Sequence, residues 1–194
     1  MLELSGITYA PATAGAPILD GVALNAQKGR PLLIAGASGS GKTSLLEIIS
    51  GLASATSGSI RWNGSVMKRR QLRWLCGIVF QFPERHFLGL SVAQELRLGH
   101  RRLGHEREQC VLERVGLNTI ASTTAPERLS GGQQRRLALA VQMLRGAEVL
   151  LLDEPTAGLD WSVRRDVLDL LAGLAREQVP VSYTHLTLPT KRIV

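Results

Sequence analysis

The 194-residue sequence has few cysteines and contains no long apolar run. Its two cysteines, Cys76 and Cys110, show no metal-ligand spacing, so we expect a reducing compartment, no disulfide, and two thiols that serve as small apolar fillers. No apolar stretch approaches the ~20 residues needed to cross a bilayer, and the first residues lack a signal-peptide pattern. We therefore expect a chain that is neither exported nor membrane-spanning by itself.

Aromatic residues are also scarce, at 4% of the chain, although hydrophobic residues make up 44%. This composition predicts a core of Leu, Val, Ile and Ala in one domain, or in one domain with an insertion. The 20 glycines indicate many tight turns or close approaches of the backbone to another group.

Acidic residues are outnumbered by basic ones, and the imbalance is local. The chain has 23 Lys and Arg against 16 Asp and Glu, a net charge of +7. Residues 61–110 hold 10 basic and 4 acidic residues, which is +6 of that total. This excess fits a solvated face, attraction to a nucleotide, an anionic membrane surface or nucleic acid, and charge alone does not choose among them.

The hydrophobic pattern indicates a mixture of strands and helices. The first 35 residues alternate apolar and polar positions, which is typical of short antiparallel strands. "PLLIAG" and "LCGIVFQ" indicate buried strands, and a basic, helix-rich stretch spans about 87–145. A last helix is expected from about Ser162 to Gln178, with one apolar face formed by Val163, Val167, Leu168, Leu171 and Leu174.

A glycine-rich loop between a strand and a helix has the pattern of a phosphate-binding loop. "GASGSGKT", residues 36–43, fits G-x-x-x-x-G-K-[ST] in the context that this motif requires. Its glycines let successive N–H groups point at phosphate oxygens, Lys42 would reach the β- and γ-phosphates, and the Thr43 hydroxyl would bind Mg²⁺. The alternative is a glycine-rich turn without a ligand. The predicted nucleotide-binding residues are Gly36, Ala37, Ser38, Gly39, Ser40, Gly41, Lys42, Thr43 and Ser44.

A second motif could supply the metal ligand and the base that phosphoryl transfer to water requires. "VLLLDEP" indicates a buried strand that ends in two carboxylates. Asp153 would hold Mg²⁺ and Glu154 would polarise the attacking water. Without the upstream phosphate loop, an acidic turn before Pro155 would be the better interpretation.

A third motif, "LSGGQ" at Leu129–Gln133, opens a helix and forms a second anion-binding N-terminus. With the phosphate loop, "VFQ", "VLLLDEP" and "GLD" in the same order, residues 1 to about 180 resemble the ATP-binding subunit of an ABC transporter. The resemblance implies an α/β fold: a P-loop NTPase core with a mainly parallel sheet, an N-terminal antiparallel β subdomain and an inserted α-helical subdomain.

The resemblance also implies roles for individual residues. Tyr9 would stack on adenine, or else simply pack at a strand end. Gln81 would reach Mg²⁺ and the attacking water, and Glu154 would be the general base. Two chains would sandwich two ATP molecules, each site being completed by the partner's signature, and the Asp160 loop would link the two sites. The signature residues are Ser130, Gly131, Gly132 and Gln133.

The stretch "FQFPE" resembles energy-coupling-factor importers of vitamins or metal ions, and related cyanobacterial and plastid ATPases. This implies three partners or ligands besides Mg²⁺: ATP, a second ATPase subunit in a homo- or heterodimer, and an integral membrane subunit whose coupling helix would meet residues 82–87. The expected location is cytoplasmic, on the inner face of the plasma membrane, with no nucleic acid bound.

Two alternatives remain at the level of sequence. One is an ABC-type ATPase that acts on nucleic acid or ribosomes, favoured by the basic window at 61–110. The other is a truncated fragment that binds ATP and hydrolyses little of it. It arises because residues 181–194 resemble a foreign tail, in which His185 would stand near the position of the family's switch histidine for the wrong reason.

Overall fold

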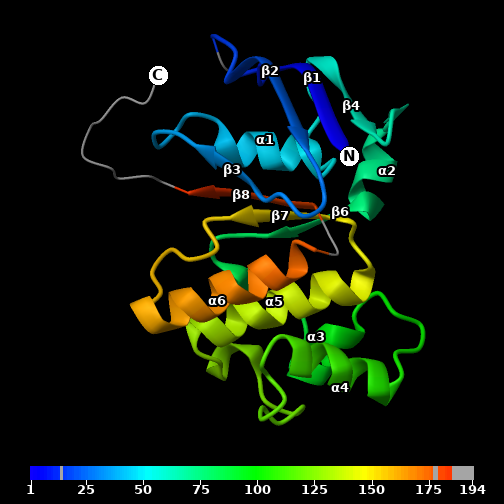
Figure 1. Ribbon diagram of the computed structural model, residues 1–194, viewed down its shortest axis with the longest axis vertical. Helices are drawn as coiled ribbons and strands as arrows, with labels where there is room; N and C mark the ends of the chain where they lie inside the picture. The colour runs from blue at the N-terminus through cyan, green and yellow to red at the C-terminus, as the bar shows by residue number, and fades with distance from the viewer. Residues whose placement is uncertain (14, 177–178, 185–194) are drawn as a thin grey trace.

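The computed structural model describes residues 1–13, 15–176 and, for the backbone alone, 179–184 (Figure 1). Two four-stranded sheets and two groups of helices are stacked on one another. The elements, in chain order, are β1 (Leu2–Tyr9), β2 (Leu19–Ala26), β3 (Leu32–Ala35), α1 (Lys42–Ile49), β4 (Ser57–Trp62), β5 (Ser65–Val66), α2 (Arg69–Leu75), β6 (Cys76–Val79), the 3₁₀ turn η1 (Pro83–Arg85), α3 (Val92–Arg97), α4 (His105–Arg114), the 3₁₀ turn η2 (Pro126–Arg128), α5 (Gly131–Arg145), β7 (Val149–Asp153), α6 (Trp161–Leu174) and β8 (Val179–Thr184).

The first sheet is antiparallel, as the alternating pattern of the first residues predicts. Its strand order is β2-β1-β4-β5, and Leu4 of β1 lies opposite Leu24 of β2 and Ile60 of β4. Leu2, Leu4 and Ile7 are buried while Ser5 is exposed, so the sheet presents one apolar face to the interior.

The second sheet is parallel, with strand order β3-β8-β7-β6. All five residues of β7 are buried, which explains why "VLLLD" is a continuous apolar run up to its last residue. Because the strands are parallel, their carboxyl ends meet at one edge of the sheet, and β3 and β7 both lead into the predicted nucleotide site there.

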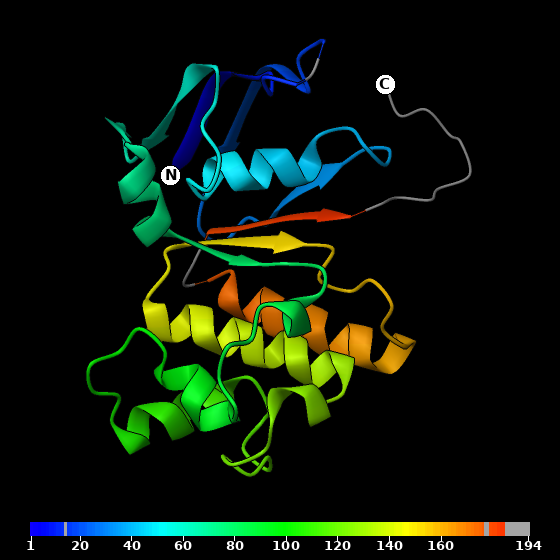
Figure 2. The same cartoon turned by 180° about the vertical axis from the view of Figure 1, so that it is seen from behind.

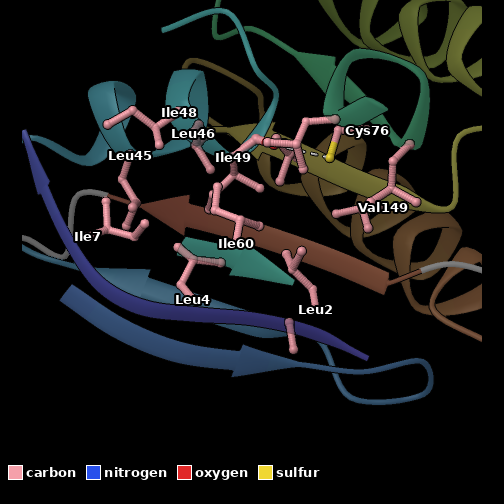
Figure 3. Packing of buried hydrophobic residues seen from close by; sticks show 14 of the residues in the cluster. Leu2, Leu4, Ile7, Leu45, Leu46, Ile48, Ile49, Ile60, Cys76 and Val149 are labelled. Atoms are coloured by element: carbon pink, nitrogen blue, oxygen red, sulfur yellow. Dashed lines mark hydrogen bonds between the residues drawn. The ribbon is translucent and has the colours of Figure 1, made fainter. Parts of the chain in front are cut away.

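Helix α1 lies between the two sheets and contributes Leu45, Leu46, Ile48 and Ile49 to the shared core (Figure 3). Leu45, Leu46 and Ile49 of this helix pack against residues of β1 and β4 on one side and Val149 of β7 on the other. The Cys76 thiol is buried in the same cluster, and burial raises its pKa to about 12, although Arg145 acts in the opposite direction. This thiol therefore stays protonated and unreactive at neutral pH.

The other face of the parallel sheet is covered by α5 and α6, and α3 and α4 pack beyond them (Figure 2). Helix α5 contacts β6 and α6 as well as α3 and α4, so it joins the sheet to the helical layer. The outer helices have their own core around Leu96, Leu117 and Leu137. The proposed insertion limits of 87 and 145 stay a prediction.

Two details differ from the sequence-based expectations. Cys110 is exposed on α4 and therefore is not a core filler. Leu168 is 50% exposed, because the apolar stripe of α6 that meets the sheet consists of Val167, Leu171 and Leu174. In the part of the chain described here, no helix is long and apolar enough to cross a membrane.

Strand β8 occupies the centre of the parallel sheet, between β3 and β7. Pro180 lies opposite Leu150 of β7, and the pairing with β3 begins one residue later, at Val181. A proline has no N–H to donate to a neighbouring strand. Because Pro180 comes before the first residue pair with β3, fewer sheet hydrogen bonds are lost than at a position inside that pairing. The interpretation of residues 181–194 as a foreign tail stays a prediction, and His185 lies outside the described residues.

Candidate nucleotide-binding site

The phosphate loop connects β3 to α1 and is shaped by its glycines. Gly39 and Gly41 have φ angles of +76° and +83°, which L side chains rarely adopt. A Cβ atom on Gly36 would lie 2.8 Å from Ser40 Oγ, and one on Gly41 would lie 2.8 Å from Ile18 Cγ2. Gly41 also caps α1 without a side-chain hydrogen bond, so the first N–H groups of the helix face the loop.

Lys42 is buried, and its ammonium group lies inside the loop. Its Nζ donates hydrogen bonds to the carbonyl oxygens of Gly36 and Ala37, at 2.9 and 2.6 Å, and to Ser40 Oγ at 3.2 Å. These three acceptors hold the positive charge where the loop can receive an anion.

The two carboxylates at the end of β7 lie beside this loop. Asp153 and Glu154 are 5% and 7% exposed, and a cavity of about 420 Å³ is lined by Glu154, Gln81 and the residues of the loop from Ser38 to Ser44 other than Ser40. Glu154 has a φ of +46°, a strained conformation for a residue with a side chain. Such strain is typical of functional positions, because the surrounding structure has to maintain it.

Gln81 extends from the segment after β6 and reaches across to Glu154. Its Nε2 donates a hydrogen bond to Glu154 Oε2 at 2.8 Å. The structure therefore brings the predicted base and the predicted glutamine into direct contact, although 73 positions separate them in the sequence. A water held between a loop-bound phosphate and Glu154 would also be within the reach of Gln81.

The donor set at this edge fits magnesium. Thr43 offers a hydroxyl, Gln81 an amide oxygen and Asp153 a buried carboxylate, and all three are the hard oxygen ligands that Mg²⁺ prefers. The described residues contain no group of three or more His, Cys, Asp or Glu that could hold a metal by themselves. Such a sparse protein ligand set suits Mg²⁺, which usually takes its remaining ligands from water and from the phosphates of the substrate.

The signature residues do not line this cavity. Ser130 is exposed at the N-terminus of α5, where its Oγ accepts a hydrogen bond from the Gln133 N–H and its own N–H donates to Gln133 Oε1. Gln133 is thus used in a capping box. Figures 1 and 2 show the N-termini of α1, α5 and α6 on the same side of the molecule, toward which β7 points.

Gly132 has a packing role that the sequence motif alone does not reveal. It is buried, and a Cβ atom added there would lie 2.3 Å from Val163 Cγ1 of α6. The adjacent Gly131 is exposed, with Leu159 Cδ2 3.7 Å from the place of its Cβ. The start of α5 therefore packs directly on the start of α6, and Ser130 and Gly131 are the exposed residues of the signature.

This contact predicts that Gly132→Ala lowers the free energy of unfolding by about 1–3 kcal/mol, because the methyl group overpacks the α5–α6 contact. Adding Val163→Ala removes the clashing Cγ1 and should recover part of the loss. Gly173→Ala is a matched control, since a Cβ on this helical glycine meets nothing within 4 Å. Chemical denaturation would measure all four proteins, and equal stability of the single and double variants would contradict the contact.

The remaining predicted residues lie at the periphery. Asp160 is the N-cap residue of α6 and is exposed, as is its neighbour Trp161. Tyr9 is half-buried against the core, and its carbonyl accepts a hydrogen bond from Ile18, whose side chain lines the cavity. Tyr9 thus contacts a residue that lines the cavity, and its stacking on adenine stays a prediction.

Sequence reasoning missed Arg135, a buried residue of α5. Its Nη2 donates hydrogen bonds to the carbonyl oxygens of Gln81 and Ala157, at 3.1 and 2.6 Å. Burial lowers the pKa of its guanidinium, and the carboxylates of Glu84 and Glu154 oppose that shift. The signal in the sequence was an arginine among apolar residues in "QQRRLALA", where one of the two arginines had to face inward. Arg135 connects the signature helix to the loops that carry Gln81 and Glu154.

A parallel sheet, a phosphate loop that opens α1, and paired acids at the end of β7 define a P-loop nucleoside triphosphatase. Residues 19–157 match the family model described as ABC transporter. The chain belongs to this family of ABC-type ATPases, and the resemblance stated from its motifs is confirmed.

Curated relatives agree with this assignment. The chain is 38% identical to ABC transporter I family member 11, chloroplastic, of Arabidopsis thaliana, and the alignment covers 95% of this chain and 72% of the relative. It is 39% identical to the energy-coupling factor transporter ATP-binding protein EcfA2 of Symbiobacterium thermophilum, over 89% of this chain and 64% of the relative. The chain thus spans about two thirds of the length of these relatives.

A solved structure confirms the fold. The structure of cbiO1 from Clostridium perfringens, described as part of the ABC transporter complex cbiONQ, superposes with a TM-score of 0.83 at 28% identity. The comparison covers 95% of this chain and 78% of that chain. The α/β fold class with its P-loop core is therefore confirmed.

Proposed function

We propose that this chain is the ATP-binding and ATP-hydrolysing subunit of an energy-coupling-factor type importer, working as a dimer with ATP at the interface. The hydrogen bond between Gln81 and Glu154, beside Lys42 and Thr43 in one cavity, carries the hydrolytic part of the proposal. The name of the Symbiobacterium relative supports the energy-coupling-factor class, and the Clostridium protein is described as part of an ABC transporter complex.

The roles of the site residues follow from their chemistry. The loop N–H groups and Lys42 would bind the phosphates and neutralise charge that develops during transfer. Bound Mg²⁺, held by Thr43, Asp153 and Gln81, would neutralise the same charge. Glu154 would accept the proton of the attacking water, and Gln81 would orient both the carboxylate and that water.

The dimer follows from where the signature lies. Ser130 and Gly131 form an exposed helix N-terminus that does not line the chain's own cavity, although such an end favours an anion. A second subunit placed head to tail would bring this end to the phosphates bound by the first chain. Asp160 and the 78% exposed Trp161 would lie in the same interface, where aromatic residues are common.

A groove beside β6 fits a segment of a membrane subunit. It has a volume of about 170 Å³ and is lined mainly by apolar residues of β6, α5 and the segment after β6, among them Val79, Phe80, Pro83, Phe87, Ala138 and Val141. Glu95 keeps this segment in place, because its Oε2 accepts the N–H groups of Leu88 and Gly89 at 2.9 and 2.7 Å. The groove adjoins Gln81, so a helix bound there would be coupled to the nucleotide site.

The excess of basic residues at 61–110 gives the nucleic-acid alternative its only support. In the structure, some of these basic side chains are engaged in contacts within the protein. Arg69 is bonded to the carbonyl oxygens of Gly51 and Leu52, and Arg97 pairs with the buried carboxylate of Glu108 at 2.9 Å. The ion pair neutralises the charge of Arg97, whereas the carbonyl contacts hold Arg69 against the fold without neutralising it. We therefore propose, as before, no nucleic-acid partner.

Subunit mixing tests the proposed dimer. Lys42→Ala should inactivate the phosphate loop, and Ser130→Glu should repel the phosphates of the facing site. Each variant alone should be nearly inactive. A 1:1 mixture should recover about a quarter of the wild-type MgATP hydrolysis, because half of the dimers are mixed and each of these has one intact composite site.

Phosphate release at increasing protein concentration would measure this recovery. A mixture of Lys42→Ala with Glu154→Gln is the matched negative control, because both changes lie in the same half-site and the mixed dimer contains no intact one. Activity of Ser130→Glu alone at the wild-type level would show that hydrolysis does not need a second chain and would contradict the dimer.

A further inference from the structure

A basic, concave patch lies on the side of the molecule away from the nucleotide site. It consists of Arg70, Arg73 and Trp74 of α2 with Arg145 at the C-terminus of α5, and it encloses about 370 Å³. Helix α2 and the C-terminus of α5 lie at the edge of the parallel sheet where the strands begin, while α1 begins at the opposite edge (Figures 1 and 2).

Two guanidinium groups of the basic patch, those of Arg73 and Arg145, are held by neutral acceptors. Arg145 donates to the Arg73 carbonyl oxygen at 2.9 Å and to Gln142 Oε1 at 3.0 Å, and Arg73 Nε donates to the Gly51 carbonyl oxygen at 3.1 Å. Within the described residues, none of the three arginines forms an ion pair with a carboxylate. The patch therefore keeps its full positive charge at the surface, with Arg73 and Arg145 held in place and Arg70 exposed beside them.

Trp74 adds a large apolar surface to the same patch. Its side chain is 74% exposed, although Leu72 and Leu75 on either side of it are buried. A tryptophan beside several cations is the side-chain combination that favours the interface between water and the headgroups of a bilayer, since the ring is apolar and its N–H is polar.

The basic patch is continuous with the groove proposed for the membrane subunit. Gln142 lines that groove, and its side chain binds Arg145 of the basic patch. Helix α2 also contacts β6, whose residues form the groove. A membrane subunit seated in the groove would therefore lie beside the basic patch.

From this arrangement we propose that Arg70, Arg73, Trp74 and Arg145 bind the anionic phospholipid headgroups of the membrane that contains the partner subunit. The orientation toward the bilayer rests on the proposed function, whereas the lipid chemistry rests on the patch itself. The planar guanidinium group of arginine can donate two parallel hydrogen bonds to the oxygens of a phosphate. Each basic residue near an anionic bilayer strengthens binding roughly fivefold.

Vesicle co-sedimentation of the full chain tests the proposal. Vesicles of phosphatidylcholine with phosphatidylglycerol should bind the protein in a salt-dependent way, and vesicles of phosphatidylcholine alone should not. Arg70→Gln should weaken vesicle binding roughly fivefold, and the separate variant Trp74→Ala should weaken vesicle binding more than Arg70→Gln does. Among the residues that the structure describes, neither side chain has a hydrogen-bond partner, so both variants should fold.

Arg165→Gln is the matched control, because it also removes one exposed positive charge but lies near the N-terminal end of α6, on the nucleotide side. It should bind anionic vesicles like the wild type. Arg70→Lys should keep most of the binding. If Arg70→Gln and Arg165→Gln weaken binding equally, only net charge matters and the proposal of a built patch is wrong.

Three further outcomes would also overturn the proposal. These are equal binding to neutral vesicles, preference for duplex DNA over anionic vesicles at matched phosphate concentration, and patch-dependent binding of inorganic pyrophosphate as tight as that of vesicles. ATP affinity, measured on the same variants, should not change. A wild-type protein that binds ATP but not anionic vesicles would contradict this proposal alone, whereas one that does not bind ATP would contradict the proposed ATPase function.

Discussion

Glu154→Gln is expected to lower the rate of MgATP hydrolysis by about 10²–10⁴-fold, the usual contribution of a general base. The amide keeps the size of the carboxylate and can still accept the hydrogen bond from Gln81, but it cannot take a proton from water. ATP affinity should stay near the wild-type value, and the variant should accumulate as an ATP-bound dimer. Phosphate release and light scattering after gel filtration would measure the two effects.

Glu148→Gln is the control for this experiment. Glu148 is exposed and stands next to the first residue of β7, at the opposite end of the strand from Glu154. Removing its charge should leave hydrolysis unchanged. Normal turnover by Glu154→Gln would show that another group is the base, and the assignment of this site would have to be abandoned.

Lys42→Ala is expected to weaken ATP binding by about 10–100-fold, because hydrogen bonds that involve a charged group contribute about 1.5–3 kcal/mol. The substitution removes the positive charge from the loop and leaves Gly36, Ala37 and Ser40 without the donor that now holds them. Hydrolysis should fall with binding. Isothermal titration with ATP, beside a thermal unfolding curve for the same protein, would measure the loss.

The unfolding curve matters because a loop without its central ammonium group could lose its shape. Lys42→Met keeps the apolar stem of the side chain and separates loss of charge from loss of packing. Lys28→Ala removes one exposed charge from the turn after β2 and should bind ATP normally. Full ATP affinity in both Lys42 variants would contradict the phosphate-loop assignment.

Much of the fold, and the residues proposed for the candidate site, could be predicted because the signals are local. Gly39 and Gly41 are needed for the positive φ angles of one loop, and the run "VLLLD" reports burial on both faces of one strand. The periodicity of α6 was less reliable for residues at the sides of its apolar face, because the sequence of a helix does not show how wide its contact with the sheet will be. Leu168 accordingly proved exposed.

The sequence by itself determined the identity and order of the motifs, and so the chemistry to predict: a loop for phosphates, oxygen ligands for magnesium, and a carboxylate to act on water. Only the tertiary structure decided which groups meet. The contact of Gln81 with Glu154, the bonds of Arg135 to two loops, the fit of Gly132 against Val163 and the clustering of Arg145 with Trp74 all join residues brought together by packing. The physical reason is that hydrophobic burial, which is nondirectional, brings the layers together, and polar partners far apart in the chain then become neighbours.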